Sequence, residues 1–303
     1  MDLSNLDPSI IKKIKEADKL SKPGGTIMKK IRDLFDYTTI NITNANVLYT
    51  DVLNELMMTE HKNANTWHLI LELRDKRTKN LIKLEDYFEL YNEYAIIGKI
   101  LLKNIKNYSG SIKNYLLAIN YCKLTGNLKR VQDLYITIAE IYDKNLMDYE
   151  KSIEYYTKAV EIDDNSSVHK IYIEIARLNI TISNFQEAQK NYEKAGEICI
   201  GNPLLHWNIK DIYCMATLCG ICLHSSNFKE DYENYKQQYS KFNDTIENKL
   251  IEGILESFEQ RDINVFVRTI TEYDKITGKL DSATKLLLTI RRMIENQDED
   301  ELR

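Results

Sequence analysis

Two segments of the chain repeat one pattern of aromatic and small residues, and this repeat restricts the fold more than any other feature. The segments are Asp148–Ala159 and Asn184–Ala195, which lie 36 residues apart. The matched pairs are Tyr149 with Phe185, Ser152 with Ala188, Tyr156 with Tyr192, and Ala159 with Ala195. A small residue lets a neighbouring helix approach closely, and the Tyr and the Ala share its helical face. The pattern therefore predicts amphipathic helices that pack on one another.

The offset between the two segments also indicates how the helices are grouped. It is close to the period of about 34 residues of a tetratricopeptide-type unit, which consists of a helix, a turn and a second helix. Weaker copies of the pattern occur at Asn107–Ala118 and Asn227–Tyr235, with longer offsets that predict loops of varying length. Because one hairpin cannot bury its own apolar face, such units stack. The sequence thus predicts an all-α, tetratricopeptide-like solenoid of helical hairpins.

Few helix-breaking residues interrupt the chain. Its 303 residues include only three Pro and ten Gly, which favours long helices with short connections. The polar run Arg74–Asn80 departs from this pattern, and we expect it to be a solvated helix end or loop. The repeat fades after Tyr239, where three more amphipathic segments are expected to form the terminal cap that a solenoid needs. We predict a repeat region at 1–239 and a C-terminal region at 240–303 with an acidic tail.

Charge, hydropathy and cysteine content narrow the class of protein. The net charge is −5, so bulk electrostatics predict no nucleic acid partner. No run of about 18 apolar residues indicates a transmembrane helix. The first residues lack the basic and apolar regions of a signal peptide. Five Cys, an odd number, are typical of reduced thiols, so we expect a cytoplasmic protein.

Familiar catalytic motifs are missing from the sequence. It contains no phosphate-binding loop, dinucleotide fingerprint, zinc-protease motif or nucleophile elbow. Cys219 and Cys222 form a CxxC pair near Cys214 and His224, which leaves a metal or redox site as one alternative. The other alternative is buried thiols at a helix interface, because neither a second ligand pair nor a preceding strand is indicated. We predict a binding protein that is not an enzyme and that has no catalytic residue, cofactor or metal.

Two apolar residues near the start of the chain allow two interpretations. Ile27 and Met28 follow a Pro-Gly-Gly turn and precede two Lys. Apolar side chains flanked by Lys in such a turn are expected to touch a membrane. Alternatively, the pair is a hydrophobic staple under the next helix.

Several segments resemble the soluble NSF attachment proteins, the alpha type in particular. The similar segments are Ile138–Tyr142 followed by Asp148–Ile153, Asn202–Leu205 through Lys210 and Asp211, Phe242–Asp244, Asn248–Leu250, Glu272–Asp274, and Ile290–Arg292 through to Leu302 and Arg303. They occur in the family's order from roughly Asn107 to the end of the chain. Weaker matches, such as Ala45–Tyr49, reach into the first third.

The resemblance implies a twisted sheet of helical repeats with a C-terminal helical bundle. It also implies an adaptor: several copies wrap the four-helix bundle of a SNARE complex and dock on the hexameric AAA+ ATPase NSF. The adaptor recruits and stimulates this ATPase for SNARE disassembly in vesicle fusion and intracellular transport. Such a protein is cytoplasmic and peripheral on the cytosolic face of membranes. A basic surface on the adaptor suits an acidic SNARE bundle, because complementary charge steers docking.

Cations for SNARE binding follow from the same resemblance. Lys170 and Lys210 match basic positions of the family that face the SNAREs, although each is also consistent with an ordinary exposed Lys. Other basic positions of the family are replaced here, by Asn127, Asp133 and Ile246. Lys129 and Arg130 lie next to two of these replacements, and we expect them to compensate.

The remaining contacts that the resemblance implies are with the ATPase and with the membrane. Leu302 matches the family Leu that stimulates the ATPase, and Glu256 and Glu259 match acidic positions that face it. Further negative charge for the ATPase comes from Asp298, Glu299, Asp300 and Glu301. Ile27 and Met28 stand where the family's N-terminal loop carries bulkier residues. Burying two such side chains stabilises by at most a few kcal/mol, so we expect weak membrane contact.

A function of a different class stays open at this point. The replaced basic positions and the short apolar turn are consistent with a tetratricopeptide-like scaffold or decoy. Such a protein would bind SNAREs or other helical partners without activating an ATPase. The matching Leu302 favours the adaptor instead.

Overall fold

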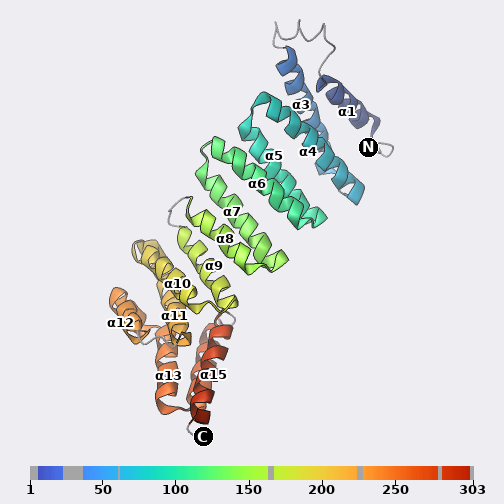
Figure 1. Ribbon diagram of the computed structural model, residues 1–303. Coiled ribbons are helices and arrows are strands. Elements are labelled where there is room, and N and C mark those ends of the chain that lie inside the picture. The colour runs from blue at the N-terminus through green and yellow to red at the C-terminus, as the bar shows by residue number, and fades with distance from the viewer. Residues whose placement is uncertain are drawn as a thin grey trace. The chain divides into compact units, whose positions relative to one another are not determined.

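The structure is entirely helical where it describes regular elements. This computed structural model describes residues 6–22, 37–60, 62–162, 167–223, 228–278 and 282–300, with the backbone alone for Tyr37 and residues 297–300. Every regular element in these ranges is a helix (Figure 1). The all-α class predicted from the repeat is therefore confirmed. The helices form two compact units, Met1–Ile141 and Tyr142–Arg303.

The first unit is a series of helices, and the connections from α3 onward are short. Its described elements are α1 (Pro8–Leu20), α3 (Tyr37–Met58), α4 (Ala64–Leu84), α5 (Tyr87–Ile100), the π-helical turn η1 (Leu101–Ile105), α6 (Tyr108–Leu124) and α7 (Leu128–Ile141). Each helix packs on the next one along the chain, from α3 on α4 to α6 on α7. This is the packing expected of stacked hairpins.

The second unit contains the longest part of the repeat and the C-terminal helices. Its described elements are the π-helical turn η2 (Tyr142–Leu146), α8 (Tyr149–Val160), α9 (Val168–Thr181), α10 (Phe185–Ile200), the 3-10 turn η3 (Pro203–Leu205), α11 (His206–Cys222), α12 (Phe228–Gln238), the 3-10 turn η4 (Ser240–Asp244), α13 (Ile246–Gln260), α14 (Ile263–Thr277) and α15 (Thr284–Asp300). One buried apolar cluster includes residues on both sides of Tyr239, such as Ile212 and Ile254. The division at 239/240 stays a prediction.

The repeated residues occupy the roles that the pattern predicts. The matched small, Tyr and Ala positions are all buried, as at Ser152, Tyr156 and Ala159 of α8. In the copy on α6, the Ser111 hydroxyl donates a hydrogen bond of 2.8 Å to the Gly98 carbonyl of α5. A bulkier residue at position 111 would prevent this close approach. The repeated residues are therefore the ones through which adjacent helices pack.

The first residue of each repeat starts a helix and also ends the one before it. The side-chain oxygens of Asn107, Asp148 and Asn184 accept hydrogen bonds from backbone N–H groups of α6, α8 and α10 respectively. The N–H groups of the same residues donate back to the preceding helical element. Five such caps follow a non-Gly residue in the left-handed region: Glu85, Lys106, Met147, Ser183 and Arg261. We call these short connections the left-handed corners.

The unequal repeat offsets arise from connection length and helix length together. The sequence predicted loops of varying length, and the connection between α6 and α7 spans residues 125–127 whereas that between α8 and α9 spans residues 161–167. The corner before each described repeat helix stays short. In addition, α6 has 17 residues where α8 has 12, and the turn η2 lengthens the first of these two repeats further. The variable loops are thus confirmed for this pair of repeats, and the unequal helices were not predicted.

The expectation that the run Arg74–Asn80 is a solvated helix end or loop was wrong. It lies within α4, and Arg74, Thr78 and Asn80 are buried. The Arg74 guanidinium makes hydrogen bonds of 2.9 and 2.8 Å to both carboxylate oxygens of Glu93 on α5. The Asn80 amide donates to Asn46 of α3 at 3.1 Å. These polar side chains are inside the fold because partners on neighbouring helices satisfy them.

Candidate partner-binding surfaces

Lys129 and Arg130 lie at the exposed start of α7 in the first unit. Their turn is shaped by Asn127, whose side-chain oxygen accepts a 3.1 Å hydrogen bond from the Arg130 N–H. No carboxylate in the described part of the chain forms an ion pair with either cation. Asn127 thus serves the helix start here instead of supplying a positive charge. The two neighbouring cations remain available to a partner.

Lys170 is exposed in the first turn of α9, in the second unit. Its backbone N–H bonds to the Ser167 carbonyl at 3.1 Å. No ion pair to its side chain is found among the described residues. This position therefore fits the predicted contact with an acidic partner.

Lys210 differs from Lys170, because it has a partner within the fold. Its ammonium on α11 lies 2.7 Å from a carboxylate oxygen of Glu247 on α13. Glu247 is only 1% exposed, and within the described residues its second carboxylate oxygen has no hydrogen-bond donor. Burial by itself lowers the pKa of Lys210, but the hydrogen bond and charge of Glu247 outweigh this and leave the pKa raised. Lys210 thus compensates a buried negative charge.

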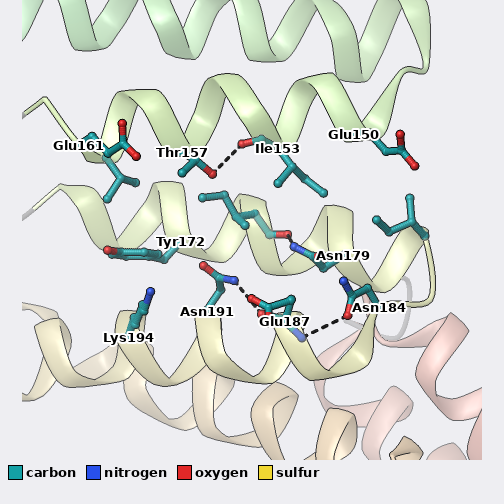
Figure 2. A pocket seen from close by; sticks show the side chains of 13 residues that line it. Glu150, Ile153, Thr157, Glu161, Tyr172, Asn179, Asn184, Glu187, Asn191 and Lys194 are labelled. Carbon is teal, nitrogen blue, oxygen red and sulfur yellow. Dashed lines mark hydrogen bonds between the residues drawn. The ribbon is translucent and has the colours of Figure 1, made fainter.

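A polar groove lies between α8, α9 and α10 in the second unit (Figure 2). Its volume is about 560 Å³. The Asn179 and Asn191 amides donate to carbonyls of their own helices at 2.9 and 2.7 Å, which holds both side chains in place. The Lys194 ammonium lies 5.4 Å from the centre of the Tyr172 ring. None of these residues was predicted as functional, because isolated amides on separate helices leave no motif in the sequence.

The predicted ATPase-facing acids are partly described. Glu256 and Glu259 are exposed in the last turn of α13, and Gln260 donates a 2.8 Å hydrogen bond to Glu256. A carboxylate near a helix C-terminus faces the negative end of the helix dipole, so these acids do not stabilise α13. The backbone of Asp298, Glu299 and Asp300 continues α15. The predicted contacts at Glu301 and Leu302, and the predicted membrane contact at Ile27 and Met28, lie outside the described residues.

The cysteines support the packing interpretation of the CxxC pair. All five Cys are unpaired and buried, and Cys219 and Cys222 lie within α11. No group of three or more His, Cys, Asp or Glu in the described ranges could hold a metal ion. Burial raises the pKa of Cys199 to about 11 and that of Cys222 to about 12.

We expect all five thiols to resist modification in the folded protein. At pH 8 the raised pKa values leave little thiolate, which is the reactive form. A chromogenic disulfide reagent should therefore react slowly with native protein and rapidly with protein in guanidinium. Fast reaction of two thiols in the native state would instead indicate an accessible CxxC pair.

Among the residues described, none of the helices combines the length and the apolar character needed to cross a bilayer.

The chain matches one protein family over most of its length. A family model described as "Soluble NSF attachment protein, SNAP" matches residues 92–295. This stretch includes Lys129, Arg130, Lys170 and Lys210, and also Glu256 and Glu259.

Individual relatives agree with the family model. Human alpha-soluble NSF attachment protein is 31% identical over 170 residues, which cover 55% of this chain and 58% of the relative. Bovine beta-soluble NSF attachment protein is 26% identical over 303 residues, covering 99% and 98%. A soluble NSF attachment protein homolog of fowlpox virus is 30% identical over 191 residues, covering 62% and 67%. The chain thus spans somewhat over half the length of the human alpha-type relative.

A solved structure supports the fold. The signal-transduction ATPase with a tetratricopeptide repeat sensor from Pyrococcus horikoshii superposes with a TM-score of 0.51 at 15% identity. The superposition covers 94% of this chain and 44% of that one. At this identity the likeness concerns the fold alone, and it confirms the tetratricopeptide-like repeats. The match of the family model over residues 92–295 shows that the chain belongs to the soluble NSF attachment protein family.

Proposed function

We propose that this protein is an adaptor that binds SNARE complexes and recruits and stimulates the AAA+ ATPase NSF. SNARE disassembly for vesicle fusion and intracellular transport is the expected outcome. The observation that carries this proposal is the family match over residues 92–295, which spans both the predicted SNARE-facing cations and the acids of α13. Several copies bind one four-helix SNARE bundle, and the protein works in the cytoplasm on the cytosolic face of membranes.

The charges on the described surfaces support separate contacts with the SNARE complex and with the ATPase. Lys129, Arg130 and Lys170 are exposed and lack carboxylate partners among the described residues, so an acidic SNARE bundle can pair with them. Glu256 and Glu259 offer the opposite charge at the end of α13. Asp298, Glu299, Asp300 and Glu301 add negative charge for the same ATPase contact, and Leu302 adds an apolar one. Ile27 and Met28 add weak peripheral contact with the membrane.

A disassembly assay tests the proposal directly. Purified SNARE complex, NSF and ATP are incubated with and without this protein, and the remaining complex is measured. We expect disassembly only when the protein is present. SNARE binding without disassembly would instead identify the scaffold or decoy, which the family relationship does not favour.

Lys170→Glu should weaken SNARE binding by about fivefold, as expected for one exposed charge at an interface. The loss should shrink at high salt, because salt screens exposed charges. Lys229→Glu, at an exposed position of α12, is a charge-matched control. Equal binding by the two variants would remove Lys170 from the interface.

Leu302→Ala should keep SNARE binding but abolish most NSF-dependent disassembly. A large apolar side chain in an acidic segment gains little from its own fold and is suited to a pocket on a partner. Pull-down of SNARE complex and the disassembly rate are measured on the same preparation. Disassembly at the wild-type rate would show that Leu302 has no part in stimulating the ATPase.

A further inference from the structure

The polar groove between α8, α9 and α10 has no part in the proposed adaptor contacts. Apolar side chains line part of it, and of these Ile175 is 4% exposed whereas Ile182 is 38% exposed. A groove that combines apolar side chains with fixed polar groups is typical of a ligand site. Its volume of about 560 Å³ also lies in the range of about 300–1,000 Å³ that is usual for such sites. The groove can therefore hold part of a partner molecule.

The groove opens on the side of α9 that is opposite to Lys170. With about 3.6 residues per turn, Tyr172, Ile175 and Asn179 lie about half a turn around the helix from position 170. Lys170 is the exposed cation of α9 that we propose for the SNARE contact. A ligand in the groove and a SNARE bundle at Lys170 would therefore contact different faces of α9.

Two buried amides of the groove have hydrogen-bonding groups to spare. Asn179 is 4% exposed and Asn191 is 8% exposed, and each donates one N–H to a carbonyl of its own helix. An Asn amide has two N–H donors and an acceptor oxygen, and no described residue donates a hydrogen bond to either oxygen. Figure 2 shows the Asn191 side chain directed from α10 toward α9. A spare donor beside a spare acceptor suits the N–H and C=O groups of a peptide backbone.

Two carboxylates mark the length of the groove. Glu150 lies in the first turn of α8 and Glu161 is its C-cap residue, and Figure 2 shows them at opposite ends of the groove. The two residues are 11 positions apart. At a rise of about 1.5 Å per residue, this separation is about 16 Å. An extended peptide advances about 3.3 Å per residue, so about five of its residues would span the groove.

Neighbouring lysines do not neutralise these two carboxylates. Three of them pair with other acids: Lys151 with Asp148, Lys158 with Glu154, and Lys190 with Glu187. Lys194 lies 5.4 Å from the centre of the Tyr172 ring, a contact that needs no carboxylate. No ion pair to Glu150 or Glu161 is found in the part of the chain that the structure describes. Three Glu and one Lys line the groove, so acids outnumber bases even when Lys190 is counted.

We propose that the polar groove binds an extended protein segment that carries basic side chains. The backbone of the segment forms hydrogen bonds with the amides of Asn179 and Asn191, and its apolar side chains contact the apolar lining. Two Lys or Arg of the segment, about four to six residues apart, pair with Glu150 and Glu161. This inference goes beyond the adaptor role, because the groove faces away from Lys170 and needs neither SNAREs nor NSF.

A dye-labelled octapeptide of alternating Lys and Val tests the proposal by fluorescence anisotropy. Val favours an extended backbone, and the Lys side chains supply the positive charge. Wild type should bind this peptide saturably and should bind the corresponding Glu–Val peptide at least about tenfold more weakly. Glu150→Gln/Glu161→Gln should weaken binding of the Lys–Val peptide by about tenfold. Glu197→Gln/Glu230→Gln removes two exposed carboxylates outside the groove and should bind like wild type.

A second variant tests the amides separately from the charges. Asn191→Leu keeps a similar side-chain volume but removes the donor and the acceptor, and it should weaken peptide binding by about fivefold. This loss should be the same at low and high salt. The loss in Glu150→Gln/Glu161→Gln should instead shrink at high salt, because salt screens exposed charges. Thermal unfolding confirms that each variant is folded.

Several results would overturn the proposal. They are a failure of wild type to bind the Lys–Val peptide saturably, wild-type binding by either groove variant, and equally tight binding of free lysine, which would indicate a small-molecule site. Lys170→Ala should bind the peptide like wild type, and a loss would place the peptide on the opposite face of α9 and overturn the proposal too. SNARE disassembly with Glu150→Gln/Glu161→Gln should proceed at the wild-type rate, so failure of the adaptor role is detected separately.

Discussion

Lys210→Ala will lower the free energy of unfolding of the second unit by about 2–3 kcal/mol. The substitution leaves Glu247 buried between α11 and α13 without its cation, and one of its oxygens already lacks a described donor. Loss of a fully buried partner costs about 3–5 kcal/mol, but the Lys210 side chain is 36% exposed and water softens the effect. Urea unfolding measures the change.

Two comparisons isolate the ion pair. Lys170→Ala, at an exposed position in the same unit, should change stability by less than about 0.5 kcal/mol. Lys210→Met/Glu247→Leu replaces both charges by apolar groups and should recover most of the loss. A Lys210→Ala variant as stable as wild type would show that Glu247 is not held by this cation.

The pH dependence of this effect follows from the raised pKa of Lys210. A Lys with a raised folded-state pKa stabilises the fold fully below its ordinary pKa of 10.5. That contribution disappears only as pH rises through the folded-state value. The difference between wild type and Lys210→Ala should therefore persist from pH 7 to pH 9. Weakened SNARE binding by a Lys210 variant would therefore have two causes, the lower stability of α11 and α13 and the loss of a contact with the SNAREs.

Glu93→Ala should destabilise the first unit by about 3–5 kcal/mol. Glu93 is 3% exposed and accepts hydrogen bonds from both Arg74 and Arg77. Its removal leaves two guanidinium groups of α4 with reduced compensation in a buried site. The Nε atoms of both Arg already lack hydrogen-bond partners among the described residues, so few other interactions remain to compensate the two guanidinium groups.

Glu89→Ala is the matched control for this cluster. Glu89 pairs with Arg77 at 2.8 Å, but its side chain is 41% exposed, so its loss should cost less than about 1 kcal/mol. Urea unfolding of both variants, with protection of α4 and α5 amides measured by hydrogen exchange, distinguishes the two effects. Equal stability of the Glu93 and Glu89 variants would show that the buried carboxylate contributes no more to stability than the exposed one.

Local sequence periodicity predicts the repeat packing well. The small residue, the Tyr and the Ala recur because each touches a neighbouring helix, so Ser152, Tyr156 and their counterparts could be identified from spacing alone. The buried CxxC pair followed from its place in a helical run. Both features depend on residues that are close in sequence.

Ion pairs between helices could not be predicted in this way. Arg74 and Glu93 are 19 residues apart, and Lys210 and Glu247 are 37 residues apart. Polarity suggested that the Arg74–Asn80 run is solvated, and the family resemblance implied that Lys210 faces the SNAREs. Only the packing of α4 on α5 and of α11 on α13 identifies the carboxylates that compensate them.

The left-handed corners determine where each unit can bend. At each of them one residue ends a helix and the next caps the following helix, so there is no slack chain to absorb a rotation. Within each unit, a partner's pull should therefore move two helices joined by a corner as one rigid pair, because rotation between them would first break the cap hydrogen bonds.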